Sequence, residues 1–263
     1  MQAMKPAVAA SGRLAVCVSV VDCLVTLPPP ALSSRSSSLM SGRGGVQVLV
    51  NSANETLVGP QLAYFERGLP AAQQQPPKEL GASNWGSLSA IDGSGRLLYP
   101  AQCMDGVVAI EGGAELRADC ARIVDQSGGC KVGEAVATPA RGRLEGRWHH
   151  IVHACAPFYH HRDDGPDPEW RRLLTNTYAS ALAAAFSLRA TAVFLPLLGA
   201  GARGAPLNET CEVAALAVAG QLHVPAHDTE VHFGVRGDVD AAQRLVRALE
   251  LAIDKQASDG PST

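Results

Sequence analysis

The chain has 263 residues, a formal net charge of −3, 46 % hydrophobic residues and seven scattered cysteines. This length fits one large domain or two small ones, and the apolar share is ordinary for a globular core. The near-neutral charge excludes the basic surface of a general nucleic-acid or anionic-membrane binder, so phosphate recognition would have to be local. Cysteines without a CxxC pair favour reduced thiols in an intracellular protein, cytoplasmic or nuclear, over a disulfide framework.

The amino-terminal segment gives no clear targeting signal. No apolar run is long enough to span a bilayer, and the apolar stretch 14–27 contains Asp22. A secretory signal peptide is therefore disfavoured, and we expect no membrane partner. Residues 1–21 contain two basic and no acidic side chains, so organelle targeting stays open as an alternative.

The first elements are two apolar strands separated by a low-complexity segment. Residues 1–12 are small and polar, and we expect a flexible terminus; residues 14–21 read as a strand, and Asp22 directly follows it. Residues 28–45 are rich in Pro, Ser and Gly and predict a mobile surface loop. The second strand covers residues 46–50 and breaks into the polar run Asn51-Ser52-Ala53-Asn54.

Residues 60–104 form a long insertion without a clear pattern, containing QQQPP and several Gly and Ser. A structureless segment of this length inside a compact domain is usually functional or disordered. Both interpretations stay open: a lid over a ligand site, or simple disorder.

The remainder alternates helices and strands. We expect helices at 107–120, 169–188, 207–222 and 239–253, strands at 135–138, 148–154, 191–197 and 230–235, and a flexible tail at 256–263. This alternation predicts one domain, residues 13–255, with an α/β three-layer sandwich around a mixed, mostly parallel sheet.

Polar and glycine-rich runs follow two of the predicted strands. In open α/β sheets, ligands bind at the carboxyl ends of the strands, where Asn51–Asn54 would lie. The run Gly199-Ala200-Gly201-Ala202-Arg203-Gly204 follows a strand and precedes a helix. Glycines and free amides at a helix amino end suit a phosphate group. A plain Asx-type turn at Asn51–Asn54 is the competing interpretation.

Four motifs in order resemble the macrodomain family of ADP-ribose-binding proteins. VNSANETLVG (50–59) resembles "VNAAN…L.GG", and MDGVVAIEGGAEL (104–116) resembles "VDG.I…AG..L". GEAVATPA with IVHACAP resembles "G.A..T.G" with "IIHTVGP", and FLPLLGAGARGAP (194–206) resembles "FPLIGTGVYGFP". The "VDG" type indicates the MacroD-like branch, and the resemblance extends from about residue 14 to 252.

The resemblance implies roles for individual residues. Asp22 would accept a hydrogen bond from the adenine amino group, and Asn54 would hold the distal ribose. Asp105 would orient or activate a water near the anomeric carbon. Ligand contacts would also come from Gly106, Val107 and the run Gly199, Ala200, Gly201, Ala202, Arg203 and Gly204. Relatives carry an aromatic residue at the position of Arg203, whose guanidinium suits a phosphate instead.

Other interpretations of single residues remain. Asp22 or Asp105 can serve as a helix or turn cap. His149 and His153 on one strand would be too far apart to share a zinc ion, so we expect His153 at the cleft rim or in the core. Cys120 or Cys155 as a catalytic thiol has no His–Asp arrangement to support it.

The resemblance implies a hydrolase that needs no cofactor and acts as a monomer. It would remove mono-ADP-ribose from acidic side chains of proteins and deacetylate O-acetyl-ADP-ribose, so its partners would be ADP-ribose and mono-ADP-ribosylated proteins. The alternative is a reader module that binds ADP-ribose without cleaving it, and a more distant one is another nucleotide-binding α/β protein. Every version requires the amides near residue 54 and the glycines near residue 201 to meet around one ligand.

Overall fold

A computed structural model describes residues 14–21, 23–25, 45–57, 104–159, 167–201, 203–222, 224–225, 227–236 and 238–259. Its described strands form one sheet in the order β1-β6-β5-β2-β4-β3. All neighbouring strands are parallel except β3 and β4. The predicted mixed, mostly parallel sheet is confirmed. The strands are β1 (Leu14–Val21), β2 (Val46–Ser52), β3 (Ala135–Pro139), β4 (His150–Ala154), β5 (Ala190–Pro196) and β6 (Thr229–Arg236).

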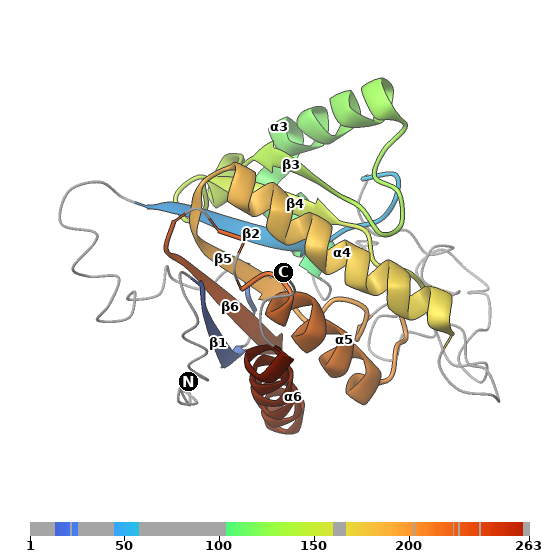
Figure 1. The fold of residues 1–263 in the computed structure, drawn as a ribbon. Helices are drawn as coiled ribbons and strands as arrows, with labels where there is room; N and C mark the ends of the chain where they lie inside the picture. The colour runs from blue at the N-terminus through green and yellow to red at the C-terminus, as the bar shows by residue number, and fades with distance from the viewer. Residues whose placement is uncertain are drawn as a thin grey trace.

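The helices cover both faces of this sheet, so the predicted three-layer sandwich is also confirmed (Figure 1). Val48 and Val50 point into the core shared with α4, α5 and α6, whereas Leu49 points into the core shared with α3. This alternation follows from the two-residue period of a strand, and it explains why β2 is apolar on both faces. The helices are α3 (Met104–Ser127), the short 3₁₀ helix η5 (Gly142–Leu144), α4 (Pro168–Ser187), α5 (Leu207–Ala219) and α6 (Val239–Asp259).

Helix α3 is longer than the predicted range 107–120 and contains a break. Gly113 has φ 64° and ψ −152°, a conformation that is almost exclusive to glycine. The carbonyl of Ala109 before the break accepts a hydrogen bond from Arg117 Nη1 at 3.3 Å. The segment Met104–Gly112 is therefore a short helix with its own direction, and it carries Asp105.

Local signals set the boundaries of the other helices. Asp167 caps α4 by accepting a hydrogen bond from the Glu169 amide at 3.0 Å, and Pro168 occupies the first turn. Helix α5 ends at Ala219, before the expected 222, with Gly220 as its C-cap. Helix α6 continues to Asp259, so residues 256–259 belong to the helix rather than to the expected flexible tail.

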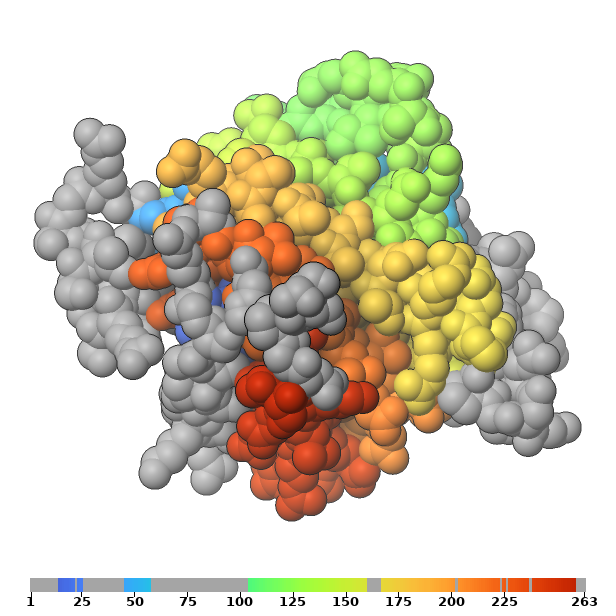
Figure 2. Space-filling model, viewed as in Figure 1, coloured from blue at the N-terminus to red at the C-terminus, as the bar shows by residue number. Residues whose placement is uncertain are grey.

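In Figure 2, α3 and α6 lie at opposite ends of the molecule.

Several predictions fall outside the described residues. These are Asp22, Ala202, the terminus 1–12, residues 260–263, and nearly all of the two expected insertions at 28–45 and 60–104. Within the described part of the chain, no helix combines the length and the apolar character needed to cross a membrane.

Candidate functional site

The carboxyl ends of β2, β4 and β5 bring three loops to one edge of the sheet. The loop after β2 is tied to β4, because the Ala53 amide donates to the Ala154 carbonyl at 3.0 Å. The loop after β4 is tied to the loop after β5, because the Tyr159 amide donates to the Arg203 carbonyl at 2.9 Å. Arg203 Nη2 also donates to the Ala53 carbonyl at 3.2 Å. The segments around residues 54 and 201 therefore lie close together, as they must if they share one ligand.

Asn54 lies in the turn that ends β2 and is 1 % exposed. Its Oδ1 accepts a hydrogen bond from Thr56 Oγ1 at 3.0 Å, and its carbonyl accepts one from the Leu57 amide at 3.2 Å. Leu57 adopts φ 56°, which is unusual for a branched residue and marks a constrained turn. The turn fixes the direction of the Asn54 amide at the edge of the site.

Asp105 is in the first turn of α3 and is partly buried. Its Oδ1 accepts a hydrogen bond from Asn51 Nδ2 at 2.7 Å. Burial raises the pKa of the Asp105 carboxyl to about 6, and the Asn51 hydrogen bond acts in the opposite direction. A carboxyl group with a pKa close to neutrality suits proton transfer. Gly106, which follows it, is buried, and Val107 is half-buried.

Behind Asp105 lies a chain of buried polar side chains. Asn51 Nδ2 is 3.3 Å from His153 Nδ1, and His153 Nε2 is 3.0 Å from Thr138 Oγ1. His153 is 3 % exposed, so its predicted place in the core is confirmed. Burial lowers the pKa of His153 to about 4, so the imidazole is neutral at physiological pH. The sequence analysis placed Asn51 only in the polar run after a strand ending at residue 50, but β2 continues to Ser52 and Asn51 lies within it. The sequence did not indicate Thr138.

The glycine-rich loop after β5 is held by its own hydrogen bonds. The Gly204 amide donates to the Gly201 carbonyl at 2.9 Å, and the Ala205 amide donates to the Gly199 carbonyl at 3.0 Å. Gly199 and Gly204 have φ 90° and 73°, which only glycine adopts without strain. The loop leads into α5 at Leu207, and its start is anchored because the Leu198 amide donates to the buried Tyr178 hydroxyl at 2.7 Å.

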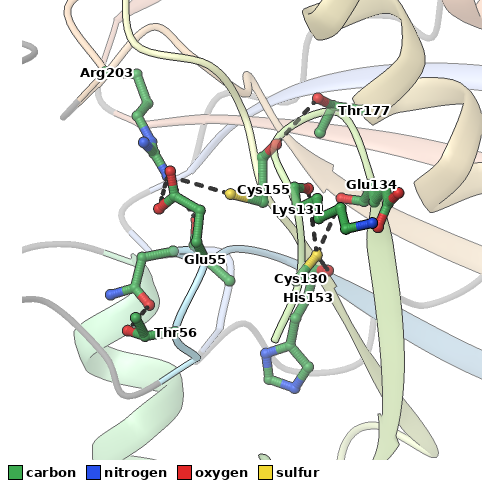
Figure 3. A network of polar contacts seen from close by, with 11 residues as sticks. Glu55, Thr56, Cys130, Lys131, Glu134, His153, Cys155, Thr177 and Arg203 are labelled. Carbon is green, nitrogen blue, oxygen red and sulfur yellow. Dashed lines mark hydrogen bonds and ion pairs between the residues drawn. The ribbon is translucent and has the colours of Figure 1, made fainter. Parts of the chain in front are cut away.

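Arg203 points inward, and its side chain joins the three loops (Figure 3). It is 3 % exposed, its Nη2 lies 3.6 Å from Glu55 Oε2 and 3.6 Å from Cys155 Sγ, and its guanidinium lies 4.2 Å from the Phe158 ring centre. Burial lowers the pKa of Arg203 to about 10 despite Glu55, so the charge remains at neutral pH. A phosphate contact by Arg203 stays a prediction, because the described contacts are with protein groups. The sequence did not indicate Glu55 or Phe158.

The buried cysteines near the site are protonated thiols. Burial raises the pKa of Cys120 to about 11 and that of Cys130 to about 12, and it raises the pKa of Cys155 as well. Cys120 Sγ is 3.8 Å from His153 Nε2, but an inert thiol beside a neutral imidazole is no activated nucleophile. Across the described ranges, no three His, Cys, Asp or Glu side chains are grouped to hold a metal ion.

The family model described as "Macro domain" matches residues 92–214. A "Macro domain-containing protein" of an Acinetobacter species is 30 % identical over 135 residues, which cover 51 % of this chain and 70 % of that protein. The chain belongs to the macro domain family.

Other relatives of this macro domain are parts of viral polyproteins. The non-structural polyprotein p200 of rubella virus strain M33 is 36 % identical over 127 residues. The match covers 48 % of this chain but only 6 % of the polyprotein, so the chain corresponds to a small part of that protein.

Solved structures agree with the fold. An Oceanobacillus iheyensis macrodomain, as a mutant with ADPR, has a TM-score of 0.59 at 17 % identity, covering 92 % of this chain and 96 % of the other. A Trypanosoma brucei macrodomain in complex with ADP has a TM-score of 0.55 at 16 % identity, with 93 % and 73 % covered. At such identities the likeness establishes the macro domain fold.

Proposed function

We propose that this macro domain binds ADP-ribose and hydrolyses its esters, as MacroD-like proteins do. Its substrates would be mono-ADP-ribose on acidic side chains of proteins and O-acetyl-ADP-ribose. The observation that supports this most is the position of Asp105. Its carboxylate has a pKa of about 6, accepts a hydrogen bond from Asn51, and belongs to the same sheet edge as the loop 199–204.

In this proposal the glycine-rich loop holds the diphosphate. The open position at Gly201, where an added Cβ would meet no heavy atom within 4 Å, leaves room for an anion to approach the backbone. Gly199 and Ala202 would supply further amides, whereas Ala200 and Gly204 would line the loop, because their own amides donate to the Leu197 and Gly201 carbonyls. The positively charged Arg203 would attract the diphosphate from behind the loop. Asp22 would accept from the adenine amino group, and Gly106 and Val107 would border the second phosphate.

At the reactive end, Asn54 would hold the distal ribose and Asp105 would take a proton from water. On a modified acidic side chain, that water would attack the anomeric carbon, and the bond from this carbon to the ester oxygen would break. The acceptor side chain would then leave as a free carboxylate. On O-acetyl-ADP-ribose, the water would instead attack the acetyl carbonyl carbon, and the ribose hydroxyl would leave as acetate forms. A neighbouring phosphate of the substrate can share the role of base, and positioning of the water supplies the remaining rate enhancement.

A turnover assay tests this proposal. The wild type and the variants Asp105→Ala and Asp105→Asn are incubated with protein mono-ADP-ribosylated on glutamate, and released ADP-ribose is measured. We expect release by the wild type and a loss of about 100-fold or more in both variants, within the range for a general base. Calorimetry with ADP-ribose, ATP and NAD serves as the binding control, with ADP-ribose expected to bind most tightly.

A reader module is the second candidate, and one feature favours it. Arg203 replaces the aromatic residue of relatives and engages Glu55 and Phe158, so the cover over the distal ribose differs. ADP-ribose binding by the wild type without any release, unchanged by Asp105→Ala, would establish the reader and exclude the hydrolase. In either case we propose that the domain acts as an intracellular monomer.

A further inference from the structure

The buried side chains behind Asp105 form a continuous line through the core. The line runs from Thr138 on β3 to His153 on β4, then to Asn51 on β2, and it ends at the Asp105 carboxylate on α3. Asn51 is 1 % exposed and Thr138 and His153 are 3 % exposed, so water does not compete with these contacts. Four separate elements thus meet at one hydrogen-bonded line whose only carboxyl group is Asp105.

The donors and acceptors along this line follow from the distances. Asn51 Nδ2 faces both Asp105 Oδ1 at 2.7 Å and His153 Nδ1 at 3.3 Å, and an amide nitrogen has two hydrogens to donate. His153 Nδ1 is then an acceptor, its proton is on Nε2, and Nε2 donates to Thr138 Oγ1 at 3.0 Å. One imidazole tautomer therefore satisfies both neighbours.

The orientation of the Asn51 amide leaves another atom unsatisfied. Among the residues that the structure describes, the buried Oδ1 of Asn51 has no hydrogen-bond partner. A buried acceptor without a partner is destabilising, so the amide keeps this orientation because its nitrogen is needed on the other side. Rotating the amide would place its oxygen next to two other acceptors, Asp105 Oδ1 and His153 Nδ1, and both would repel it.

We propose that His153 is a positioning residue for Asp105, acting through the Asn51 amide, which it holds in the orientation that donates to the carboxylate. The inference rests on the proposed hydrolase for its effect on turnover, but the hydrogen-bonded line itself exists without substrate. The described polar partners of the His153 ring are Asn51, Thr138 and Cys120, none of which is a predicted ligand residue. The effect of His153 is to fix one carboxylate oxygen of Asp105 and leave the other for water.

Among the residues that the structure describes, no charged side chain other than Asp105 has a contact with this line. On α3, Cys120 Sγ is 3.8 Å from His153 Nε2, and Asp119 is paired with Arg141 and Arg122. From the β3 side, Cys130 Sγ is 3.7 Å from the His153 carbonyl. Burial keeps both thiols neutral by raising the pKa of each, so the titration of Asp105 reports on the line itself.

Two amide substitutions at His153 test the hydrogen bonds of the two imidazole nitrogens one at a time. In His153→Asn, the amide oxygen falls near the position of Nδ1, so the acceptor for Asn51 is kept and the contact with Thr138 is lost. In His153→Gln, the longer amide reaches Thr138 and the acceptor for Asn51 is lost. Thr138→Val is a milder third variant that removes the acceptor of Nε2 without touching Asn51. His227→Gln, on the loop before β6, serves as the control.

Carbon-13 NMR titration of the Asp105 carboxyl in the full chain is the first measurement. We expect its apparent pKa to rise by about one unit in His153→Gln, to rise less in Thr138→Val, and to stay unchanged in His153→Asn and His227→Gln. Equal pKa values in His153→Asn and His153→Gln, with circular dichroism showing both folded, would overturn the proposal. If a His153 variant does not fold, Thr138→Val replaces it: an Asp105 pKa equal to that of the wild type would then overturn the proposal.

Turnover gives the second measurement. For His153→Gln we expect kcat to fall about 10- to 100-fold, the range for residues that orient a group in contact with the reacting atoms, with KM and ADP-ribose affinity within about threefold of the wild type. For His153→Asn we expect kcat within about threefold of the wild type. If the role of His153 were purely structural, the loss of activity would instead follow the loss of stability, with the least stable variant the least active. If the wild type itself does not turn over, the hydrolase proposal fails, and the NMR titration still decides the role of His153.

Discussion

Arg203 Nη2 donates to the carbonyl of Ala53 at 3.2 Å, across 150 positions of sequence. This contact joins the loop after β5 to the loop after β2, so the glycine-rich run and Asn54 cannot separate without breaking it. Glu55 and Phe158 surround the same guanidinium. Arg203 is therefore a buried cation that connects the loops of this macro domain from the inside.

Loss of that cation should destabilise the protein. We expect Arg203→Met to lower the free energy of unfolding by about 1–3 kcal/mol, because the Ala53 carbonyl loses its donor and Glu55 loses its charged partner, although the Glu55 side chain is 38 % exposed. The double variant Glu55→Gln with Arg203→Met should regain about 1 kcal/mol or more of that loss. Urea unfolding at pH 7 measures both.

The control for this experiment is Arg172→Met. Arg172 forms an exposed ion pair with Glu169, three residues away on α4, and such pairs contribute little. A change comparable to that of Arg203→Met would show that the effect does not depend on burial. Additive effects of the two substitutions in the double variant would show that Glu55 and Arg203 are not coupled.

The ionised carboxylate of Asp105 should destabilise the folded protein at neutral pH. Its pKa is about 6 in the folded state against 3.8 for the free group, so the folded chain binds more protons between these values, and stability falls as pH rises through them. We therefore expect Asp105→Asn to raise the free energy of unfolding at pH 7 by about 2–3 kcal/mol while abolishing turnover. Thermal unfolding at pH 7 and at pH 4 measures the effect, which should fall to about 0.5 kcal/mol at pH 4.

His153 should have the opposite pH dependence over almost the same range. Its pKa is about 4 when folded against 6.5 when free, so the stability it contributes is present above pH 6.5 and is lost as pH falls towards 4. In the wild type, the fall of stability with pH caused by Asp105 and the rise caused by His153 largely cancel. In Asp105→Asn, stability should therefore rise clearly from pH 4 to pH 6.5, and a flat profile in that variant would contradict the prediction.

Turnover should rise with pH through a midpoint near 6, because Asp105 must be ionised to accept a proton from water. Single-turnover rates from pH 4.5 to 8 would reveal this midpoint. A rate independent of pH in this range would mean that the substrate's own phosphate, rather than Asp105, is the base.

Gly113 should be intolerant of substitution even though it has space around it. An added Cβ would meet no heavy atom within 4 Å, but φ 64° with ψ −152° is strained for any other residue. We expect Gly113→Ala to cost about 1–3 kcal/mol and to shift the Met104–Gly112 segment that carries Asp105. Gly146→Ala is the matched control: its Cβ would also meet open space, but its φ is ordinary, so the change should be within about 0.5 kcal/mol. Chemical denaturation compares the two.

Tyr178→Phe should loosen the start of the glycine-rich loop. The Tyr178 hydroxyl is buried and accepts from the Leu198 amide at 2.7 Å, so its removal leaves a buried donor without a partner. We expect a loss of about 1–3 kcal/mol in stability, with weaker ADP-ribose binding by calorimetry. Ser187→Ala, on the exposed end of the same helix, should leave both unchanged. Unaltered affinity in a destabilised Tyr178→Phe would show that the loop does not depend on this anchor.

The sequence by itself determined the strands, the order of the elements and the layers. Runs such as Val46–Val50 and the helical spacing around Trp170 and Leu174 depend on local periodicity, which tertiary contacts did not override. The Gly199–Gly204 run and Asn54 also predicted the turns after β5 and β2, because glycine and amide side chains mark turns at strand ends.

Only the tertiary structure decided how the side chains within those loops are used. Whether Arg203 faces a ligand or the core depends on Glu55 and Phe158, which belong to other strands' loops and lie far away in sequence. The line from Thr138 to Asp105 likewise needs four elements in register. Desolvation shifts the pKa values of Arg203, His153 and Asp105, and desolvation is a property of the packed core, which no local pattern of residues encodes.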